Sequence, residues 1–132
     1  MIIRPTWDAY FLALASTAST RSTCARRQVG AVLVNDIKHH IVGTGYNGSV
    51  PGAGHCIDGH CPRGRKSYDE KPAFTDYGDC IAVHAEMNAL KQADSLIGPV
   101  SGSAWVMYVT CHPCPDCKAI LDQRRIRVVY SW

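Results

Sequence analysis

The first patterned segment of the chain is Thr6–Thr20, with the sequence TWDAYFLALASTAST. Its larger apolar side chains recur three and four residues apart, at Trp7, Tyr10, Phe11, Leu14 and Ala15. Residues at this spacing lie on one face of an α-helix, while the positions between them face the other way. The segment is therefore predicted to form an amphipathic helix.

Two apolar segments with β-strand character follow. They are VGAVLV at Val29–Val34 and HHIVGTGY at His39–Tyr46, and the polar residues Asn35–Lys38 lie between them. Valine, isoleucine and tyrosine favour strands, and a short polar connection between two such runs is typical of a turn. We therefore expect two strands joined by a turn.

Helices and strands alternate in the second half of the chain. The remaining predicted elements are a helix over Val83–Ala93, a strand over Ala104–Thr110, a helix over Pro115–Gln123 and a strand over Ile126–Tyr130. This alternation predicts a layered α/β sandwich. At 132 residues, without an internal repeat or a linker, the chain is predicted to form a single domain over residues 1–132.

One long segment lacks a regular pattern. Residues 47–80 are rich in glycine, proline, cysteine and charges of both signs. This is long for a loop with no structure of its own, so we expect something other than apolar packing to order it. We treat it as a Cys/His-rich insertion within the domain.

Composition narrows the class of protein. Apolar residues make up 46% of the chain and charged residues 19%, as in globular proteins, and the net charge of +3 is mild. This charge permits an anionic ligand but is less than a nucleic-acid-binding protein usually carries. No run of residues is long and apolar enough for a membrane span, and the first residues do not resemble a signal peptide. We therefore expect a cytoplasmic protein.

The cysteines and histidines suggest metal chemistry. Seven cysteines, an odd number, and six histidines indicate a metal or catalytic site more than a disulfide framework. Cys114 and Cys117 are three residues apart at the start of a predicted helix, where the local field favours thiolate. Together with His84 they form a three-ligand set for zinc. Three protein ligands leave a fourth position open for water, as in catalytic zinc sites.

Glu86 is the candidate acid–base residue. Residues two apart in the middle of a helix point in different directions, but at a helix start both side chains can converge on a site beyond the end. His84 would then bind the metal, and Glu86 would reach the water without binding the metal. The pattern His-x-Glu followed by Pro-Cys-x-x-Cys is the signature of zinc deaminases, which attack C4 of cytosine or C6 of adenine. Glu86 would move protons from the water to the ring nitrogen and to the departing ammonia.

Simpler interpretations exist for each motif alone. The Cys-x-x-Cys pair could form a structural zinc knuckle or a redox pair, and a single histidine is more often a core residue. Cys111 precedes Cys114 by three residues but lies at a predicted strand end, so we interpret it as a loop or pocket-wall thiol, with metal ligation as the lesser alternative. The combination of His84, Glu86, Cys114 and Cys117 in this order favours the deaminase.

Four segments together resemble the deoxycytidylate (dCMP) deaminases of the cytidine deaminase superfamily: RRQVGAVLV, GTGYNGSVPGAGHC, HAEMNAL and YVTCHPCPDCK. The resemblance implies a three-layer α/β/α sandwich with a central mixed sheet of five strands. It also implies hydrolysis of dCMP to dUMP and ammonia, which supplies dUMP for thymidylate synthesis. Members are usually homo-oligomers, often hexamers, and some respond to dCTP and dTTP with magnesium. The family commonly continues past the fourth strand, whereas this sequence stops at VVYSW, so we expect a fold shortened at the C-terminus.

The resemblance also suggests substrate contacts. It implies that Asn47, in GYNG, contacts the sugar hydroxyl, although an Asn-Gly pair also favours a plain turn. A monophosphate requires cationic or amide partners, and Arg26 and Arg27 before the first strand are the candidates. Most surface arginines are only solvated, so this assignment has a simple alternative.

Related dCMP deaminases carry a second, structural zinc, which draws on cysteines near the first strand and after the GYNG segment. Cys24 and Cys56 match those positions, and Cys61 and Cys80 would complete a closed four-ligand site. His55 or His60 could replace one of them. Free thiols or one disulfide are the alternatives. Such a site would explain how the insertion is ordered.

Other functions stay open from the sequence. The close alternatives are a tRNA adenosine or single-stranded DNA deaminase, which usually has a more basic face, and a nucleoside-level cytidine deaminase, which lacks a phosphate subsite. Outside enzymes, the chain could be a zinc-stabilised binding module. A pure scaffold has no need for Glu86 beside a metal, so this residue favours an enzyme.

Overall fold

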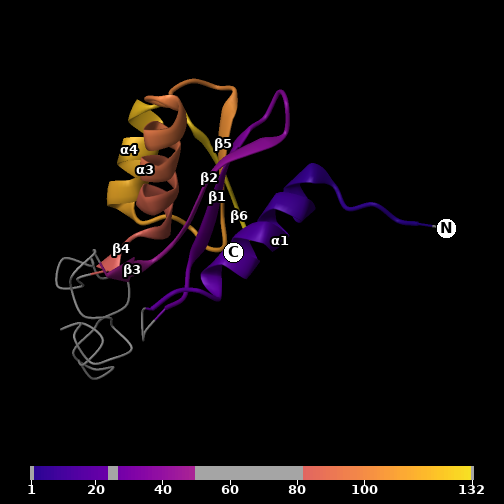
Figure 1. The fold of residues 1–132 in the computed structure, drawn as a ribbon, viewed down its shortest axis with the longest axis horizontal. Helices are drawn as coiled ribbons and strands as arrows, with labels where there is room; N and C mark the ends of the chain where they lie inside the picture. Colours follow the sequence, from indigo (N-terminus) through magenta and orange to yellow (C-terminus); the bar gives the residue numbers. More distant parts are fainter. Residues whose placement is uncertain (1, 24–26, 50–81, 132) are drawn as a thin grey trace.

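The computed structural model of the protein describes residues 2–23, 27–49 and 82–131. Its elements, with the labels of Figure 1, are α1 (Trp7–Ser19), β1 (Gly30–Asn35), β2 (His40–Tyr46), β3 (Gly48–Ser49), β4 (Ala82–Val83), α3 (Ala85–Ile97), β5 (Trp105–Val109), α4 (Pro115–Gln123) and β6 (Arg127–Tyr130). None of the helices in these ranges is long and apolar enough to cross a membrane.

The main sheet is mixed and has the strand order β2-β1-β5-β6. β1 pairs antiparallel with both β2 and β5, whereas β5 and β6 run parallel. Figure 1 shows α1 on one face of this sheet and α3 with α4 on the other. The predicted three-layer α/β/α sandwich with a mixed sheet is therefore confirmed. Within the described residues the main sheet has four strands, and β3 and β4 form a separate antiparallel pair.

Alternation along β1 divides the core into two clusters. Ala31 and Leu33 are fully buried in the cluster that includes α3 and α4. Val32 and Val34 are buried on the opposite face, with Phe11 of α1. Successive strand residues point to opposite faces of a sheet, so one apolar run can support two helical layers. The unbroken apolar sequence of this strand is explained by burial on both faces.

The helix boundaries agree with the sequence where local signals are strong. Thr6 caps α1 by accepting a hydrogen bond from Ala9 N, and α4 spans the predicted residues Pro115–Gln123. The prediction of a helix over Val83–Ala93 was wrong at both ends, because Val83 belongs to β4 and the helix runs from Ala85 to Ile97. It stops at Gly98, whose φ of 88° favours glycine and ends the helix. The last turn is mostly exposed, so apolar periodicity did not reveal it.

Two glycines of β2 let α3 approach the sheet closely. A Cβ atom at Gly43 would clash with the carbonyl oxygen of Ala89, and one at Gly45 would clash with that of Ala85. A Cβ at Gly45 would also lie 2.6 Å from the backbone nitrogen of Ala89. These contacts are to backbone, which cannot rotate away as a flexible side chain can. The first turns of α3 can therefore lie directly on β2 because these two positions carry no side chain.

Gly45→Ala is expected to destabilise the protein by about 1–3 kcal/mol, because α3 has to move to admit the methyl group. Urea unfolding measures the loss. Thr44→Ala, at the neighbouring exposed position of β2, is the control and should change stability much less. Equal stabilities of the two variants would contradict the close packing of α3 on Gly45.

Tyr108 of β5 links the sheet to the start of α1. Its side chain is 2% exposed, and its hydroxyl donates a 2.7 Å hydrogen bond to Asp8 Oδ1. Burial, and then the hydrogen bond and negative charge of Asp8, raise the pKa of Tyr108 well above its usual value of about 10. The folded protein therefore holds this proton at a pH where the unfolded chain releases it.

Stability is expected to fall above pH 10 partly because of Tyr108. Below that pH the tyrosine is neutral in both states and its contribution is complete; above it, ionisation favours the unfolded chain. Tyr108→Phe should cost about 1 kcal/mol at pH 8, through the lost hydrogen bond. The difference between wild type and variant should shrink at pH 11, as measured by urea unfolding. A difference that stays constant with pH would contradict the raised pKa.

Candidate active site

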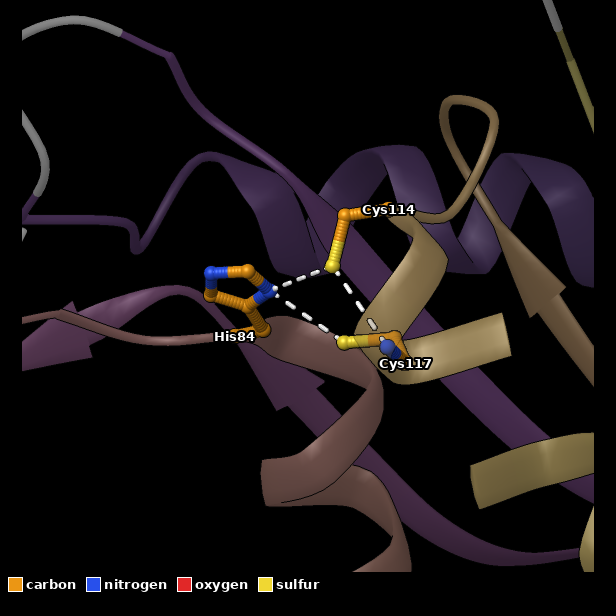
Figure 2. A group of neighbouring side chains, drawn as sticks. All are labelled: His84, Cys114 and Cys117. Atoms are coloured by element: carbon orange, nitrogen blue, oxygen red, sulfur yellow. Dashed lines mark hydrogen bonds between the residues drawn. The ribbon is translucent and has the colours of Figure 1, made fainter. Parts of the chain in front are cut away.

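The starts of two helices bring together the predicted metal ligands. His84 is the N-cap residue of α3, Cys114 is the N-cap residue of α4, and Cys117 lies in the first turn of α4. His84 Nδ1 lies 3.2 Å from Cys117 Sγ and 3.3 Å from Cys114 Sγ. Figure 2 shows Nδ1 of the imidazole directed toward both sulfur atoms. These are side chains separated by up to 33 residues in sequence.

Local sequence explains how each ligand is presented. Pro115 occupies the first turn of α4, where its fixed φ suits a helix start and its missing N–H is not needed. Cys114 has extended backbone angles, and its Sγ accepts a hydrogen bond from Cys117 N at 3.5 Å. The two thiols are thereby placed side by side. His84 makes no side-chain cap to its own helix, which leaves the ring directed at the sulfurs.

The three ligand atoms fit a zinc ion. One nitrogen and two sulfur atoms lie within 4.8 Å of one another, as a tetrahedral site requires of neighbouring ligands. Zinc binds well to thiolate and imidazole donors, whereas calcium and magnesium prefer oxygen donors. Burial, and then the negative charges of Glu86 and Cys114, raise the pKa of the Cys117 thiol. A bound dication would lower the pKa of this thiol again and favour the thiolate. The negative charge gathered at the site therefore suits a cation.

Glu86 lies in the first turn of α3 and is only 4% exposed. Its negative charge acts on the thiols of Cys117 and Cys111 and raises the pKa of both, so the carboxyl group lies near the metal group. A buried carboxylate needs compensation, and the positive end of the helix dipole supplies part of it. The structure therefore brings Glu86 to the three candidate ligands, while the metal group itself consists of His84, Cys114 and Cys117.

Cys111 is separate from this group. It is buried in the hydrophobic cluster between the sheet and the helices α3 and α4, and it is 5% exposed. Burial raises the pKa of its thiol, as it does that of Cys117, so position and not acidity separates the two cysteines. Among the described residues, the metal-ligand group leaves Cys111 out. Its role as a loop or pocket-wall thiol stays a prediction.

Asn47 follows β2 directly and is 8% exposed. Its Oδ1 accepts hydrogen bonds from Val29 N at 2.8 Å and from Ser22 Oγ at 2.6 Å. Its Nδ2 donates to the carbonyl oxygen of Arg27 at 2.6 Å, which uses one of two hydrogens. The side chain thus joins the end of β2 to the segment before β1. Its contact with a sugar hydroxyl stays a prediction, for which the second Nδ2 hydrogen is the available donor.

Of the two predicted phosphate-binding arginines, Arg27 lies in the described part of the chain. Its positive charge lowers the pKa of the Cys111 thiol, against the stronger effect of burial. Arg26 lies outside the described residues. So do Cys24, Cys56, Cys61 and Cys80, the residues predicted to bind a second zinc.

The family model of the cytidine and deoxycytidylate deaminase zinc-binding region matches residues 5–132. The chain belongs to this deaminase family. A deoxycytidylate deaminase of Mycobacterium phage D29 is 43% identical, over 96% of this chain and 95% of the phage protein. A deoxycytidylate deaminase of Schizosaccharomyces pombe is 38% identical, over 96% of this chain but 37% of the yeast protein. The chain therefore spans nearly all of one relative and about a third of the other.

A solved deaminase structure has the same fold. The crystal structure of dCMP deaminase from the cyanophage S-TIM5, in complex with dCMP and dUMP, aligns with a TM-score of 0.68 and 27% identity. The alignment covers 98% of this chain and 83% of the cyanophage chain. The layers described above thus belong to a known deaminase architecture.

In this member of the deaminase family, sequence reasoning missed Asn88. Its Nδ2 donates to the carbonyl oxygen of Tyr46 at 2.8 Å, and its backbone N–H donates to that of His84 at 3.0 Å. It therefore joins the first turn of α3 to the end of β2, one residue before Asn47. Its position four residues after His84, on the same helix face, was the available signal.

Proposed function

We propose that the protein catalyses the zinc-dependent hydrolytic deamination of dCMP to dUMP and ammonia. The carrying observation is the convergence of His84, Cys114 and Cys117 with the buried carboxyl group of Glu86. A scaffold has no need for an acidic residue buried beside a metal group. Similarity over nearly the full length of a phage deoxycytidylate deaminase supports dCMP as the substrate.

The residues have distinct roles in this proposal. His84, Cys114 and Cys117 would hold the zinc, which, when bound, lowers the pKa of a water molecule so that it can attack near neutral pH. Glu86 accepts a proton from the attacking water and delivers it to the ring nitrogen of cytosine. The carboxylate then takes the remaining hydroxyl proton from the oxygen added to C4 and passes it to the amino group, so that the C4–N bond breaks, the C4 carbonyl forms and ammonia leaves. The helix starts beside Glu86 favour its negative charge between these transfers.

Substrate contacts and further ligands complete the proposal. Arg27 and Arg26 would bind the phosphate, and the Nδ2 group of Asn47 would donate to the sugar. Cys24, Cys56, Cys61 and Cys80 would hold a structural zinc. Residues 1–132 would form one domain. The enzyme would be a homo-oligomer of such domains, regulated by dCTP and dTTP with magnesium. It would act in the cytoplasm, where thiols stay reduced.

A comparison of substrates tests the proposal. One zinc-loaded preparation is assayed with dCMP, deoxycytidine, CMP and a short single-stranded DNA, with ammonia release as the readout. A preference of at least tenfold in kcat/KM for dCMP over deoxycytidine is expected, because the phosphate provides charge-assisted contacts. Activity on the oligonucleotide alone would keep the chemistry but contradict the substrate. If the zinc-loaded protein deaminates none of the four compounds, the proposed deaminase activity is contradicted.

A further inference from the structure

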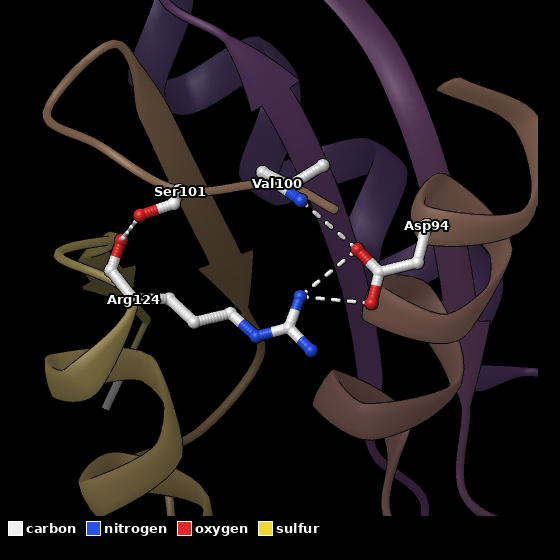
Figure 3. A network of polar contacts seen from close by, with 4 residues as sticks. All are labelled: Asp94, Val100, Ser101 and Arg124. Atoms are coloured by element: carbon white, nitrogen blue, oxygen red, sulfur yellow. Dashed lines mark hydrogen bonds and ion pairs between the residues drawn. The ribbon is translucent and has the colours of Figure 1, made fainter. Parts of the chain in front are cut away.

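A second link joins α3 and α4 at the ends opposite to the metal group. Arg124 Nη1, at the C-cap of α4, lies 2.9 Å from Asp94 Oδ1 and 2.8 Å from Asp94 Oδ2. Both side chains are about one third exposed, so the pair is partly shielded from water. Figure 3 shows the guanidinium of Arg124 reaching across to the carboxylate of Asp94 on the other helix.

The same two residues organise the connection between the helices and β5. Asp94 Oδ1 also accepts a hydrogen bond from Val100 N at 3.0 Å. The carbonyl oxygen of Arg124 accepts hydrogen bonds from Gly102 N at 2.8 Å and from Ser101 Oγ at 3.2 Å. The carboxylate and the carbonyl group therefore bind successive residues of one segment. These hydrogen bonds fix the position of the two helix ends relative to each other, which an isolated surface ion pair would not do.

The spacing along the two helices is equal. Asp94 follows His84 by ten residues, and Arg124 follows Cys114 by ten residues. At 1.5 Å per residue, the ion pair lies about 15 Å along each helix from the residues that begin it. Leu90 of α3 is buried between the two ends, in the same hydrophobic cluster as Leu121 of α4. The helices are thus joined at both ends, and between these ends both contribute residues to one hydrophobic cluster.

We propose that Asp94 and Arg124 are positioning residues for the metal group, an inference that rests on the proposed zinc-dependent function. The imidazole is carried by α3 and both thiols by α4, so the distance between nitrogen and sulfur depends on how the two helices lie relative to each other. Sliding by one residue would move a ligand about 1.5 Å along the axis. Misplacements of this size affect both metal affinity and catalysis. The ion pair restricts this sliding from the far end.

Neutral substitutions of similar shape test the pair. In Asp94→Asn and Arg124→Gln, the dissociation constant for zinc, measured by competition with a chromophoric chelator, is expected to rise about 2- to 30-fold. The kcat for dCMP should fall while KM changes little, because the substrate contacts are on other residues. The double variant should lose less than the two single effects combined, since either change breaks the same link. Arg124→Lys keeps the charge and should recover part of the zinc affinity.

A second ion pair on α4 supplies the matched controls. Lys118 and Asp122 pair at 2.6 Å within the helix, exposed, and do not reach α3. Asp122→Asn and Lys118→Gln should therefore leave the zinc dissociation constant within about twofold of wild type. In a Cys114→Ala background, Asp94→Asn should have no further effect on zinc binding. That result assigns the effect to this metal group and not to another site.

The outcomes separate this proposal from the function. If Asp94→Asn lowers the melting temperature but binds zinc as tightly as Asp122→Asn does, the pair is only structural and the inference is wrong, whether or not dCMP is deaminated. If zinc affinity falls in the Asp94 and Arg124 variants while the wild type does not deaminate dCMP, the positioning role of the pair is supported. The proposal that dCMP is the substrate is then wrong.

Discussion

Glu86→Gln is expected to lower kcat for dCMP about 100- to 10,000-fold, the usual contribution of a general acid–base group. The amide keeps the size of the side chain but cannot accept the proton of the attacking water. The three metal ligands are unchanged, so zinc content should stay at the wild-type value. Steady-state kinetics together with metal analysis of the same sample measures both quantities.

Asp116→Asn is the matched control for Glu86→Gln. Asp116 also lies in the first turn of a helix that begins at the metal group, but its side chain is exposed. The two variants therefore lose a similar interaction with a helix dipole, and only one loses a buried carboxylate beside the ligands. Asp116→Asn should retain near-native kcat. Similar activities of the two variants would show that Glu86 does not transfer the proton.

Cys114→Ser is expected to remove one zinc per chain and to abolish turnover. The wild type should contain two zinc ions per chain and the variant one, if the proposed structural site is filled. The hydroxyl group can still accept the hydrogen bond from Cys117 N, so the start of α4 keeps its cap. A neutral hydroxyl is a poor replacement for a thiolate ligand, so the variant should lose the metal. Because the cap is retained, this loss would not result from unfolding of the helix.

Metal analysis and circular dichroism measure the outcome for Cys114→Ser. Cys111→Ala is the control, because it removes a thiol three residues away that lies in the core and outside the ligand group. It should lose some stability and keep its zinc. Native zinc content and native turnover in Cys114→Ser would contradict the assigned ligand set. One zinc ion per wild-type chain would contradict the second site.

The sequence predicted the parts of the site that depend on local chemistry. Cys114, Pro115 and Cys117 stand at a helix start because proline suits the first turn and a side chain with lone pairs suits the cap. The spacing of two thiols by three residues then places them together whatever the rest of the fold does. The α4 boundaries and the strand pattern of the sheet followed from similar short-range signals.

Other features depend on contacts between distant segments. Glycine has no preference for strands, so Gly43 and Gly45 carried no local signal. In the folded protein they determine how closely α3 lies on β2. The sequence did not reveal that the Oδ1 atom of Asn47 accepts hydrogen bonds from Ser22 and Val29, which come earlier in the chain. Periodicity also missed the last turn of α3, which carries Asp94 into range of Arg124.

The sequence by itself determined most of the helices and strands, the donor types and the identity of the candidate acid–base residue. These depend on side-chain chemistry and on neighbours within a few positions. Only the tertiary structure decided that Nδ1 of His84 faces the sulfurs, that Glu86 is buried beside Cys117, and that α3 and α4 are joined at both ends. Each of these is a distance between residues about 30 positions apart or on different elements. Such distances arise when helices pack on a common sheet, and no local pattern encodes them.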